Sequence, residues 1–313
     1  MILKKDISLK SPMKTLSKVF IATSSFSELK KTFENRAKKK NFLFKKNPLK
    51  KKLTSNQLVK YAKDCKYIIA GTEIYNQKTI DQLTKLKYIF RLGSGIDNLD
   101  INHLKKKKII FKKSKITPEI AVAELIVGYI FSIYRNIIEH NNNLKNKIWK
   151  KQMGSILNGK TLGIIGYGKV GKYLYKIIKS FGVKILVNDK KKIDVKNTNI
   201  NKLIKNSDII SLNINLNSKK KILDKKKLKL CKKNCFIINT SRPEVIDYNF
   251  LYLMLKKKEI LGAGLDVFME EPYSGKLINL ENVILTPHIG SYSKEIRSKM
   301  EQEALRNILE SNI

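Results

Sequence analysis

The stretch that decides the fold is Thr161–Lys192, which reads TLGIIGYGKVGKYLYKIIKSFGVKILVNDKKK. Its first part, Leu162–Ile165, is a short apolar run of the kind that a buried parallel strand needs. In Val170–Phe181 apolar residues recur at helical spacing, and Gly182 ends the predicted helix. Val183–Val187 follows as a second apolar run. The stretch therefore predicts a strand, a helix and a second, parallel strand.

Three glycines at G-x-G-x-x-G spacing join the first strand to the helix: Gly166, Gly168 and Gly171. The first allows a tight turn, the second lets the backbone approach a pyrophosphate, and the third lets the helix pack close to the strand. Asp189, after the second strand, is placed to accept the ribose hydroxyls of an adenosine. This context predicts dinucleotide binding. The alternative is a glycine-rich turn of another doubly wound fold, in which the glycines serve packing alone.

The chain has 313 residues, enough for two domains, and a formal net charge of +39. Such a charge is typical of proteins that bind nucleic acid or an anionic surface. However, only six of its 65 basic residues are arginine, and the lysines are spread along the whole chain. Their runs, such as Lys105–Lys108, carry no interleaved aromatic residues for base stacking. We therefore predict solvated faces and loops, and no nucleic-acid partner.

Cysteine usage indicates neither a disulfide framework nor a metal site. There are three cysteines, and no histidine or further cysteine completes a metal set around the last two of them. Buried free thiols are the expectation, at Cys65, Cys231 and Cys235.

The most apolar stretch, Ile120–Ile138, approaches the length of a membrane span. It contains Glu124 and Arg135, and it follows a helix start at Thr117 and Pro118, with Thr117 as the expected N-cap. We therefore predict a core or subunit-interface helix and no membrane partner. No signal peptide is recognisable at the N-terminus, where Met13 is an alternative start, so we expect a cytoplasmic protein.

Strands and helices alternate along the chain, which predicts an α/β protein with parallel sheets. The strand ending at Leu92 runs into Gly93-Ser94-Gly95, a turn whose amides suit a carboxylate or phosphate oxygen; an ordinary strand–helix turn is the alternative. The expected strands are 18–23, 67–70, 88–92, 208–212, 235–239, 261–267 and 282–285, and the expected helices are 26–38, 53–63, 80–86, 119–138, 250–258 and 293–309.

Three isolated residues follow different strands of the second half: Arg242, Glu271 and His288. An arginine can hold a carboxylate with two parallel hydrogen bonds, and a histidine is a proton donor and acceptor near neutral pH. A carboxylate nearby favours the imidazolium and orients the ring. Of the three histidines, His103 and His140 lie in stretches rich in lysine and asparagine, which makes His288 the catalytic candidate.

These residues lie in stretches that resemble the D-isomer-specific 2-hydroxyacid dehydrogenases. The resemblance implies a Rossmann-like NAD-binding domain over residues 118–288, inserted into a flavodoxin-like substrate domain over 1–117 that 289–313 completes. It also implies an active site in the cleft and a homodimer to which Ile120–Ile138 contributes. The matching stretches, in the order of the family, are RLGSGIDNLD (91–100), TPEIAVAELIVGYIFSIYRN (117–136), GKTLGIIGYGKVG (159–171), INTSRPEVID (238–247), GLDVFMEEP (264–272) and LTPHIGSYS (285–293).

The resemblance also implies roles for single residues. Arg242 would bind the carboxylate and carbonyl of a 2-oxo acid, His288 would give a proton to the carbonyl oxygen, and Glu271 would keep His288 protonated and oriented. The amides of Ser94 and Gly95 would hold the substrate carboxylate. On the cofactor side, Lys169 and Val170 would contact the pyrophosphate with the three glycines, Asp189 would hold the ribose, and Thr240 and Asp266 would lie along the nicotinamide.

Two departures from the family pattern stand out. Pro243 replaces the glycine that usually follows the arginine, and Asn213 and Asn215 replace a histidine and a proline on the adenine side. Asp189 favours NAD over NADP because it would repel a 2′-phosphate.

The sequence thus predicts an NAD-dependent oxidoreductase for a small 2-hydroxy acid, and RLGSGIDNLD looks most like the phosphoglycerate dehydrogenase branch. The alternatives are a hydroxypyruvate or glyoxylate reductase, and a non-catalytic NAD(H)-sensing protein on the same fold.

Overall fold

The computed structural model describes residues 16–93, 95–214 and 221–311, and the chain forms two compact units. The first unit consists of Met1–Thr117 and Arg297–Ile313, and the second of Pro118–Ile296. The second unit is therefore an insertion in the sequence of the first. The return to the first unit falls at residue 297, within a helix, and not at residue 289 as the sequence suggested.

The first unit is built on a five-stranded parallel sheet in the order β2-β1-β3-β4-β5. This is the strand order of flavodoxin-like folds. Its elements are β1 (Ser17–Ile21), α1 (Lys31–Lys39), β2 (Phe42–Lys46), α2 (Ser55–Ala62), β3 (Tyr67–Ala70), α3 (Gln77–Gln82), β4 (Tyr88–Arg91), α4 (Ile101–Lys106), β5 (Ile110–Lys113) and the returning α11 (Lys294–Leu309).

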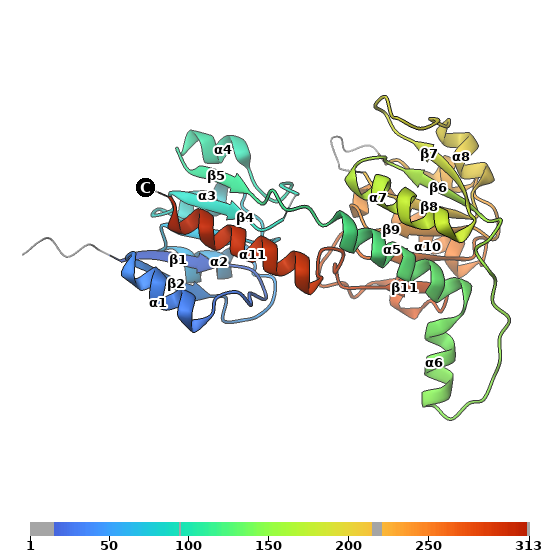
Figure 1. Cartoon of the computed structure of the whole chain (residues 1–313), viewed down its shortest axis with the longest axis horizontal. Helices are drawn as coiled ribbons and strands as arrows, with labels where there is room; N and C mark the ends of the chain where they lie inside the picture. Colours follow the sequence, from blue (N-terminus) through green and yellow to red (C-terminus); the bar gives the residue numbers. More distant parts are fainter. Residues whose placement is uncertain (1–15, 94, 215–220, 312–313) are drawn as a thin grey trace, which may run out of the picture. The chain divides into compact units, whose positions relative to one another are not determined.

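Helices cover both faces of this sheet because neighbouring residues of each strand point to opposite sides. Phe20, Ile68 and Ile89 pack with α2, α3 and α4 in one core cluster. Helices α1 and α11 lie on the other side of the sheet (Figure 1). The central strands β3 and β4 and most of β1 are buried on both faces, which explains their near-continuous apolar runs.

The second unit contains a six-stranded parallel sheet in the order β11-β10-β9-β8-β6-β7. The chain passes from β6 to β7 on one side and then crosses to β8 on the other, so the strand order reverses beside β6 as in Rossmann-like folds. Its elements are α5 (Glu119–Tyr134), α6 (Ile137–Lys145), β6 (Thr161–Ile165), α7 (Lys169–Ile178), β7 (Lys184–Asn188), α8 (Ile200–Asn206), β8 (Ile209–Leu212), α9 (Lys225–Leu228), β9 (Phe236–Asn239), α10 (Tyr248–Lys256), β10 (Gly262–Leu265) and β11 (Val283–Leu285).

Two apolar clusters hold this unit together. Helices α5 and α7 lie side by side on one face of the sheet (Figure 1), where Ile126, Ile130 and Leu174 pack on the strands. On the other face α8, α9 and α10 supply residues such as Leu203 and Leu251.

The long apolar helix is shorter than expected. It begins at Glu119 with Pro118 as its N-cap residue, so the prediction of Thr117 as the cap is wrong. It ends at Tyr134, because Asn136 takes a left-handed conformation with φ of 50°, and α6 then starts at Ile137. No single described helix is long and apolar enough to cross a membrane; α5 and α6 pass that test only as a pair bent by 64°.

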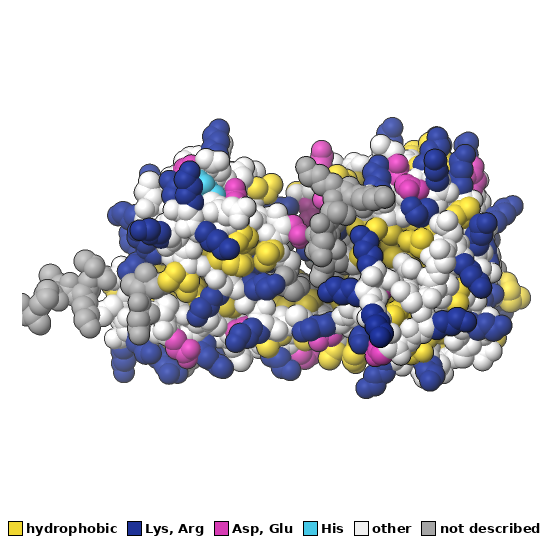
Figure 2. Space-filling model, turned by 90° about the horizontal axis from the view of Figure 1, so that it is seen from above, with side chains coloured by type: hydrophobic (Ala, Val, Ile, Leu, Met, Phe, Trp, Pro, Cys, Tyr) yellow, Lys and Arg dark blue, Asp and Glu magenta, His cyan; other side chains and the backbone are white. Residues whose placement is uncertain are grey.

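Lysine and arginine side chains are scattered over the visible face of both units (Figure 2). Several lie in small ion pairs, such as Lys18 with Asp64 and Lys172 with Asp194. The thiol of Cys235 is buried, and so is that of Cys65, whose pKa burial raises to about 12, while Cys231 is half-buried.

Candidate active site

The predicted catalytic residues follow three neighbouring strands. Strands β9, β10 and β11 pair in parallel, so their carboxyl ends share one edge of the sheet. Arg242 comes three residues after β9, Glu271 six residues after β10, and His288 three residues after β11. Ligands of open parallel sheets bind at this edge.

His288 and Glu271 are directly paired. The Nδ1 atom of His288 lies 3.0 Å from Oε1 and 3.2 Å from Oε2 of Glu271. The backbone N–H of Phe268 donates to the same Oε1 at 3.3 Å, which anchors the carboxylate on its own loop. Since Nδ1 is engaged, the ring orientation is fixed, and Nε2 on the opposite side of the ring is the atom available for proton transfer. His103, by contrast, is buried and lies 2.9 Å from Asp81.

Arg242 is held by its own turn. The buried side chain of Asn239, the last residue of β9, donates to the Arg242 carbonyl at 2.8 Å and accepts from the Ser241 N–H at 3.0 Å. The guanidinium donates to the Ser241 carbonyl at 2.8 Å. Pro243 begins a short 3-10 helix directly after Arg242. The sequence analysis did not identify Asn239 as a residue of the site. The signal that could have found it is the polar residue at the end of the apolar run CFIIN (235–239).

Asp266 holds the turn that carries His288. Its side chain is fully buried, and it accepts hydrogen bonds from Thr286 Oγ1 at 2.5 Å and from the N–H groups of Ile289 and Gly290, each at 2.7 Å. Burial raises the pKa of Asp266, and these hydrogen bonds oppose that rise. The family resemblance implied a place for Asp266 along the nicotinamide. It did not reveal that both carboxylate oxygens accept hydrogen bonds from the turn that carries His288.

The glycine turn between β6 and α7 has the form that a pyrophosphate needs. Gly166 has φ of +95°, and a Cβ on it would lie 2.5 Å from the Asn213 carbonyl oxygen. A Cβ on Gly171 would lie 2.1 Å from the Gly166 carbonyl oxygen. Gly168 has open space on its Cβ side and is the N-cap of α7, so the first-turn N–H groups at Lys169 and Val170 face this turn.

Two further residues fit a dinucleotide. Asp189 lies directly after β7, and its carboxylate accepts from the Tyr167 N–H at 2.6 Å and the Lys191 N–H at 2.8 Å. Thr240 follows β9, and its hydroxyl oxygen is buried with no hydrogen-bond partner among the described residues. Because an unpaired buried hydroxyl is costly, a bound ligand group is the natural partner for it. The site therefore fits NAD.

The predicted substrate turn belongs to the first unit. Gly93 has φ of +143°, and Gly95 is half-buried, while Ser94 lies outside the described residues, as does Asn215 in the second unit. Arg91 lies beneath this turn: its Nε donates to Asn98 at 3.3 Å, and its Nη1 donates to the Leu92 carbonyl.

Comparison with known proteins agrees with this geometry. Residues 127–290 match the model of the NAD-binding domain of the D-isomer-specific 2-hydroxyacid dehydrogenases. The chain is 36% identical to a glyoxylate reductase of Thermococcus litoralis over 256 residues, which is 76% of this chain and 77% of the relative. It is also 36% identical to a D-3-phosphoglycerate dehydrogenase of Methanocaldococcus jannaschii over 258 residues, 78% of this chain but 49% of that longer protein.

Among solved structures, the NAD⁺-bound 3-phosphoglycerate dehydrogenase of Entamoeba histolytica superposes with a TM-score of 0.76 at 26% identity, covering 94% of this chain and 95% of that one. The strand orders, the glycine turn and these likenesses agree. The chain therefore belongs to the D-isomer-specific 2-hydroxyacid dehydrogenases, NAD-dependent oxidoreductases that act on CH–OH groups.

Proposed function

We propose that this enzyme reduces a short 2-oxo acid, of the glyoxylate and hydroxypyruvate class, to the corresponding 2-hydroxy acid. The observation that carries the reaction is the pairing of His288 with Glu271 at 3.0 Å, at the strand edge from which Arg242 also emerges. A histidine oriented by a carboxylate, with an arginine at the same strand edge, supplies the groups that carbonyl reduction needs.

Each residue has a separate task in this proposal. Bound NADH supplies the hydride. Arg242 binds the substrate carboxylate and carbonyl oxygen, which fixes the face of the carbonyl that is attacked. His288 holds a proton on Nε2 and donates it to the carbonyl oxygen; in the oxidative direction the same atom takes the proton back. Glu271 stays on Nδ1 throughout and stabilises the charged ring.

Other residues would bind the cofactor and the carboxylate of the substrate. We propose that Asp189 binds the adenosine ribose, that the glycine turn and the N–H groups of Lys169 and Val170 bind the pyrophosphate, and that Thr240 contacts the nicotinamide side. In the first unit, the backbone at Ser94 and Gly95 would bind the substrate carboxylate.

The substrate class is supported by the relatives. Glyoxylate reductases of Thermococcus and Pyrococcus species and a hydroxypyruvate reductase of Thermotoga maritima are 27% to 36% identical to this chain. A phosphorylated acid is the second candidate, because the phosphoglycerate dehydrogenase of M. jannaschii is equally similar and RLGSGIDNLD resembles that branch.

The test is NADH oxidation by the purified protein against glyoxylate, hydroxypyruvate, pyruvate and 3-phosphohydroxypyruvate. We expect the highest kcat/KM with one of the two short acids; a preference for the phosphorylated acid would select the second candidate. Substitution of His288→Gln should lower kcat by about 10²- to 10⁴-fold and leave NADH binding unchanged.

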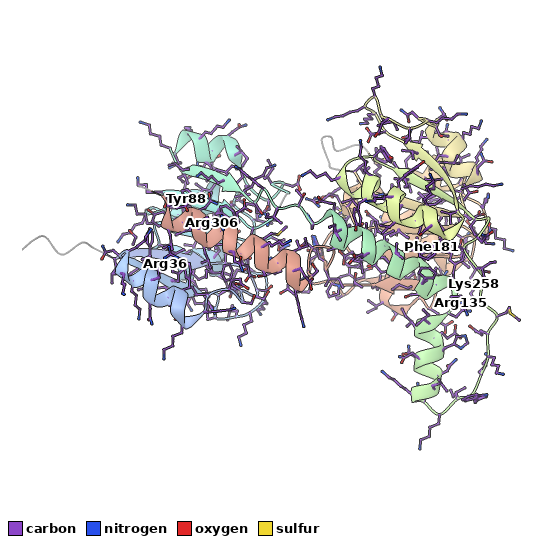
Figure 3. All side chains as sticks on the ribbon, viewed as in Figure 1. Arg36, Tyr88, Arg135, Phe181, Lys258 and Arg306 are labelled. Atoms are coloured by element: carbon purple, nitrogen blue, oxygen red, sulfur yellow. The ribbon has the colours of Figure 1, made fainter. Side chains whose placement is uncertain are left out.

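Arg242→Lys should lower kcat/KM by about 10²-fold, because lysine cannot make the two parallel hydrogen bonds. The matched control is Arg306→Lys, an exposed arginine on α11 of the first unit (Figure 3). NADH binding without turnover on any acid, in wild type and variants alike, would instead favour the NAD(H)-sensing alternative.

We also propose a homodimer formed through α6 and the segment after it, which project from the second unit (Figure 1). Apolar side chains on this arm are open to solvent: Trp149 is 82% and Met153 is 97% exposed. Arg135, directly after α5, and Phe181, whose ring contacts Phe131, lie at the base of the arm (Figure 3). Exposed apolar surface of this kind is typical of a protein interface.

A further inference from the structure

A buried tyrosine reaches the turn that carries His288. Tyr129 lies in the middle of α5, on the face that packs against the sheet, and its side chain is 2% exposed. Its ring lies over β10 at Gly264, where a Cβ would come within 2.8 Å of the ring. Glycine at this position therefore makes room for the ring, and the hydroxyl extends beyond it to the end of β11.

From Tyr129 a chain of hydrogen bonds leads to the histidine turn. The hydroxyl of Tyr129 is hydrogen-bonded to Thr286 Oγ1, and Thr286 Oγ1 donates to Asp266 Oδ1 at 2.5 Å. Since Thr286 has a single hydroxyl proton and gives it to the carboxylate, Tyr129 is the donor to Thr286. Burial raises the pKa of Tyr129 well above its ordinary value, so this proton is present at every working pH.

The turn needs such support. His288 has φ of 56°, a left-handed conformation that is unfavourable for a non-glycine residue and persists only where the surroundings enforce it. Asp266 binds the turn before His288 at Thr286 and after it at Ile289 and Gly290. Consecutive hydrogen bonds in a buried network strengthen one another. The hydrogen bond that Tyr129 donates to Thr286 therefore strengthens the one that Thr286 donates to Asp266.

We propose that Tyr129 is a positioning residue of the enzyme, which acts through Thr286 and Asp266 to hold the backbone of His288 in the conformation that presents its ring to Glu271 and the substrate. This inference rests on the proposed role of His288.

The experiment compares Tyr129→Phe with Tyr134→Phe. Both tyrosines are buried on α5, but the hydroxyl of Tyr134 has no hydrogen-bond partner among the described residues. Tyr129→Phe should lower kcat by about 3- to 10-fold, the worth of one hydrogen bond, with KM for the 2-oxo acid and the Kd for NADH within about twofold of wild type. Tyr134→Phe should leave kcat unchanged.

A second pair separates positioning from packing. Thr286→Val removes the hydroxyl and should lower kcat at least as much as Tyr129→Phe, whereas Thr286→Ser restores the hydroxyl and should restore kcat. Equal kcat for Tyr129→Phe and wild type, or an equal loss in Tyr134→Phe, would overturn the inference. His288→Gln distinguishes the two proposals: if it is inactive while Tyr129→Phe is fully active, only the role of Tyr129 fails, and if His288→Gln turns over normally, the proposed function fails first.

Discussion

The carboxylate of Asp189 accepts a hydrogen bond from the backbone N–H of Tyr167 at 2.6 Å. Tyr167 lies between the first two glycines of the turn, and Asp189 directly follows β7, so this bond ties the predicted pyrophosphate site to the predicted ribose site. The second carboxylate oxygen accepts from the Lys191 N–H at 2.8 Å. The acid is therefore positioned before any cofactor binds, which lowers the cost of binding.

Removing this charge should change the choice of cofactor. Asp189→Asn keeps an oxygen for the Tyr167 N–H but loses the negative charge that would repel a 2′-phosphate. We expect the ratio of kcat/KM for NADH over NADPH to fall by about 10-fold or more, which corresponds to about 1.4 kcal/mol. Steady-state kinetics with both cofactors measures the ratio. The control is Asp194→Asn, an exposed acid paired with Lys172, and an unchanged ratio in Asp189→Asn would contradict the role of the charge.

The elements around this site were predictable because their signals are local. The bounds of β6, α7 and β7 differ from the expected ones by a few residues at most, since the glycines and the apolar runs mark where each element begins and ends. The edge strands β2 and β5 were missed, because FLFKK and IFKK end in lysines that remain exposed or half-buried. Helix α6 was missed because the run of polar residues His140–Asn143 shows no apolar face at helical spacing.

Other features depend on residues far away in the sequence, and no local pattern contains them. The helix expected from Phe26 begins only at Lys31, because the N–H groups of Ser27 and Glu28 donate to Glu301 on α11. At the candidate site, the pattern yielded Arg242, Glu271 and His288 as isolated residues after strands. It did not yield Tyr129 or Thr286, whose roles depend on the packing of α5 against β10 and β11.

The first unit should show a pH-dependent contribution from Asp64. Its carboxylate lies 2.5 Å from Lys18 Nζ and 3.2 Å from Lys45 Nζ, and the hydrogen bond from Lys18 holds the pKa of Asp64 well below its ordinary value. A pKa that is lower in the folded than in the unfolded state stabilises the fold above the unfolded value of about 3.9, and this stabilisation is lost as the pH falls through the folded pKa.

Asp64→Asn should therefore lower the free energy of unfolding at pH 7 by about 1 kcal/mol or less, because the pair is about one-third exposed and screened by solvent. Urea unfolding at pH 7 and at pH 3 measures the effect. The difference between the variant and wild type should shrink at the lower pH, and 1 M salt at pH 7 should shrink it too. A difference that grows on acidification would refute the assigned sign.

The proposed role of α6 and the segment after it in a dimer can be tested by introducing one charge. Trp149→Asp places a carboxylate at a position that is 82% exposed in the single chain, so it should not disturb the fold of the monomer. In a dimer that buries this position the unpaired charge would cost several kcal/mol. We expect light scattering to give a dimer mass for wild type and a monomer mass for Trp149→Asp, with the thermal unfolding of the monomer unit retained. The control is Lys150→Asp, because this exposed neighbour also gains a carboxylate but loses no apolar ring. A monomeric wild type would contradict the dimer.

The last prediction concerns Glu301, which joins the end of the chain to its beginning. Its side chain is 1% exposed and accepts hydrogen bonds from the Ser27 N–H at 2.7 Å, the Glu28 N–H at 3.0 Å and Arg297 Nε at 2.9 Å. Glu301→Gln keeps the size of the side chain, but it removes the buried negative charge that faces the half-buried Arg297, and it turns an N–H₂ group toward donors. We expect a loss of about 3 kcal/mol in the free energy of unfolding.

Thermal unfolding of Glu301→Gln beside Glu310→Gln, an exposed acid directly after the same helix, measures this loss. If the two variants unfold at the same temperature, the contact contributes nothing. If only Glu301→Gln is destabilised, α11 is held to the first unit by a charge as well as by its apolar face. That result would also explain why no helix forms between β1 and Lys31: the N–H groups of Ser27 and Glu28 already have a partner on a helix that the chain reaches only at its end.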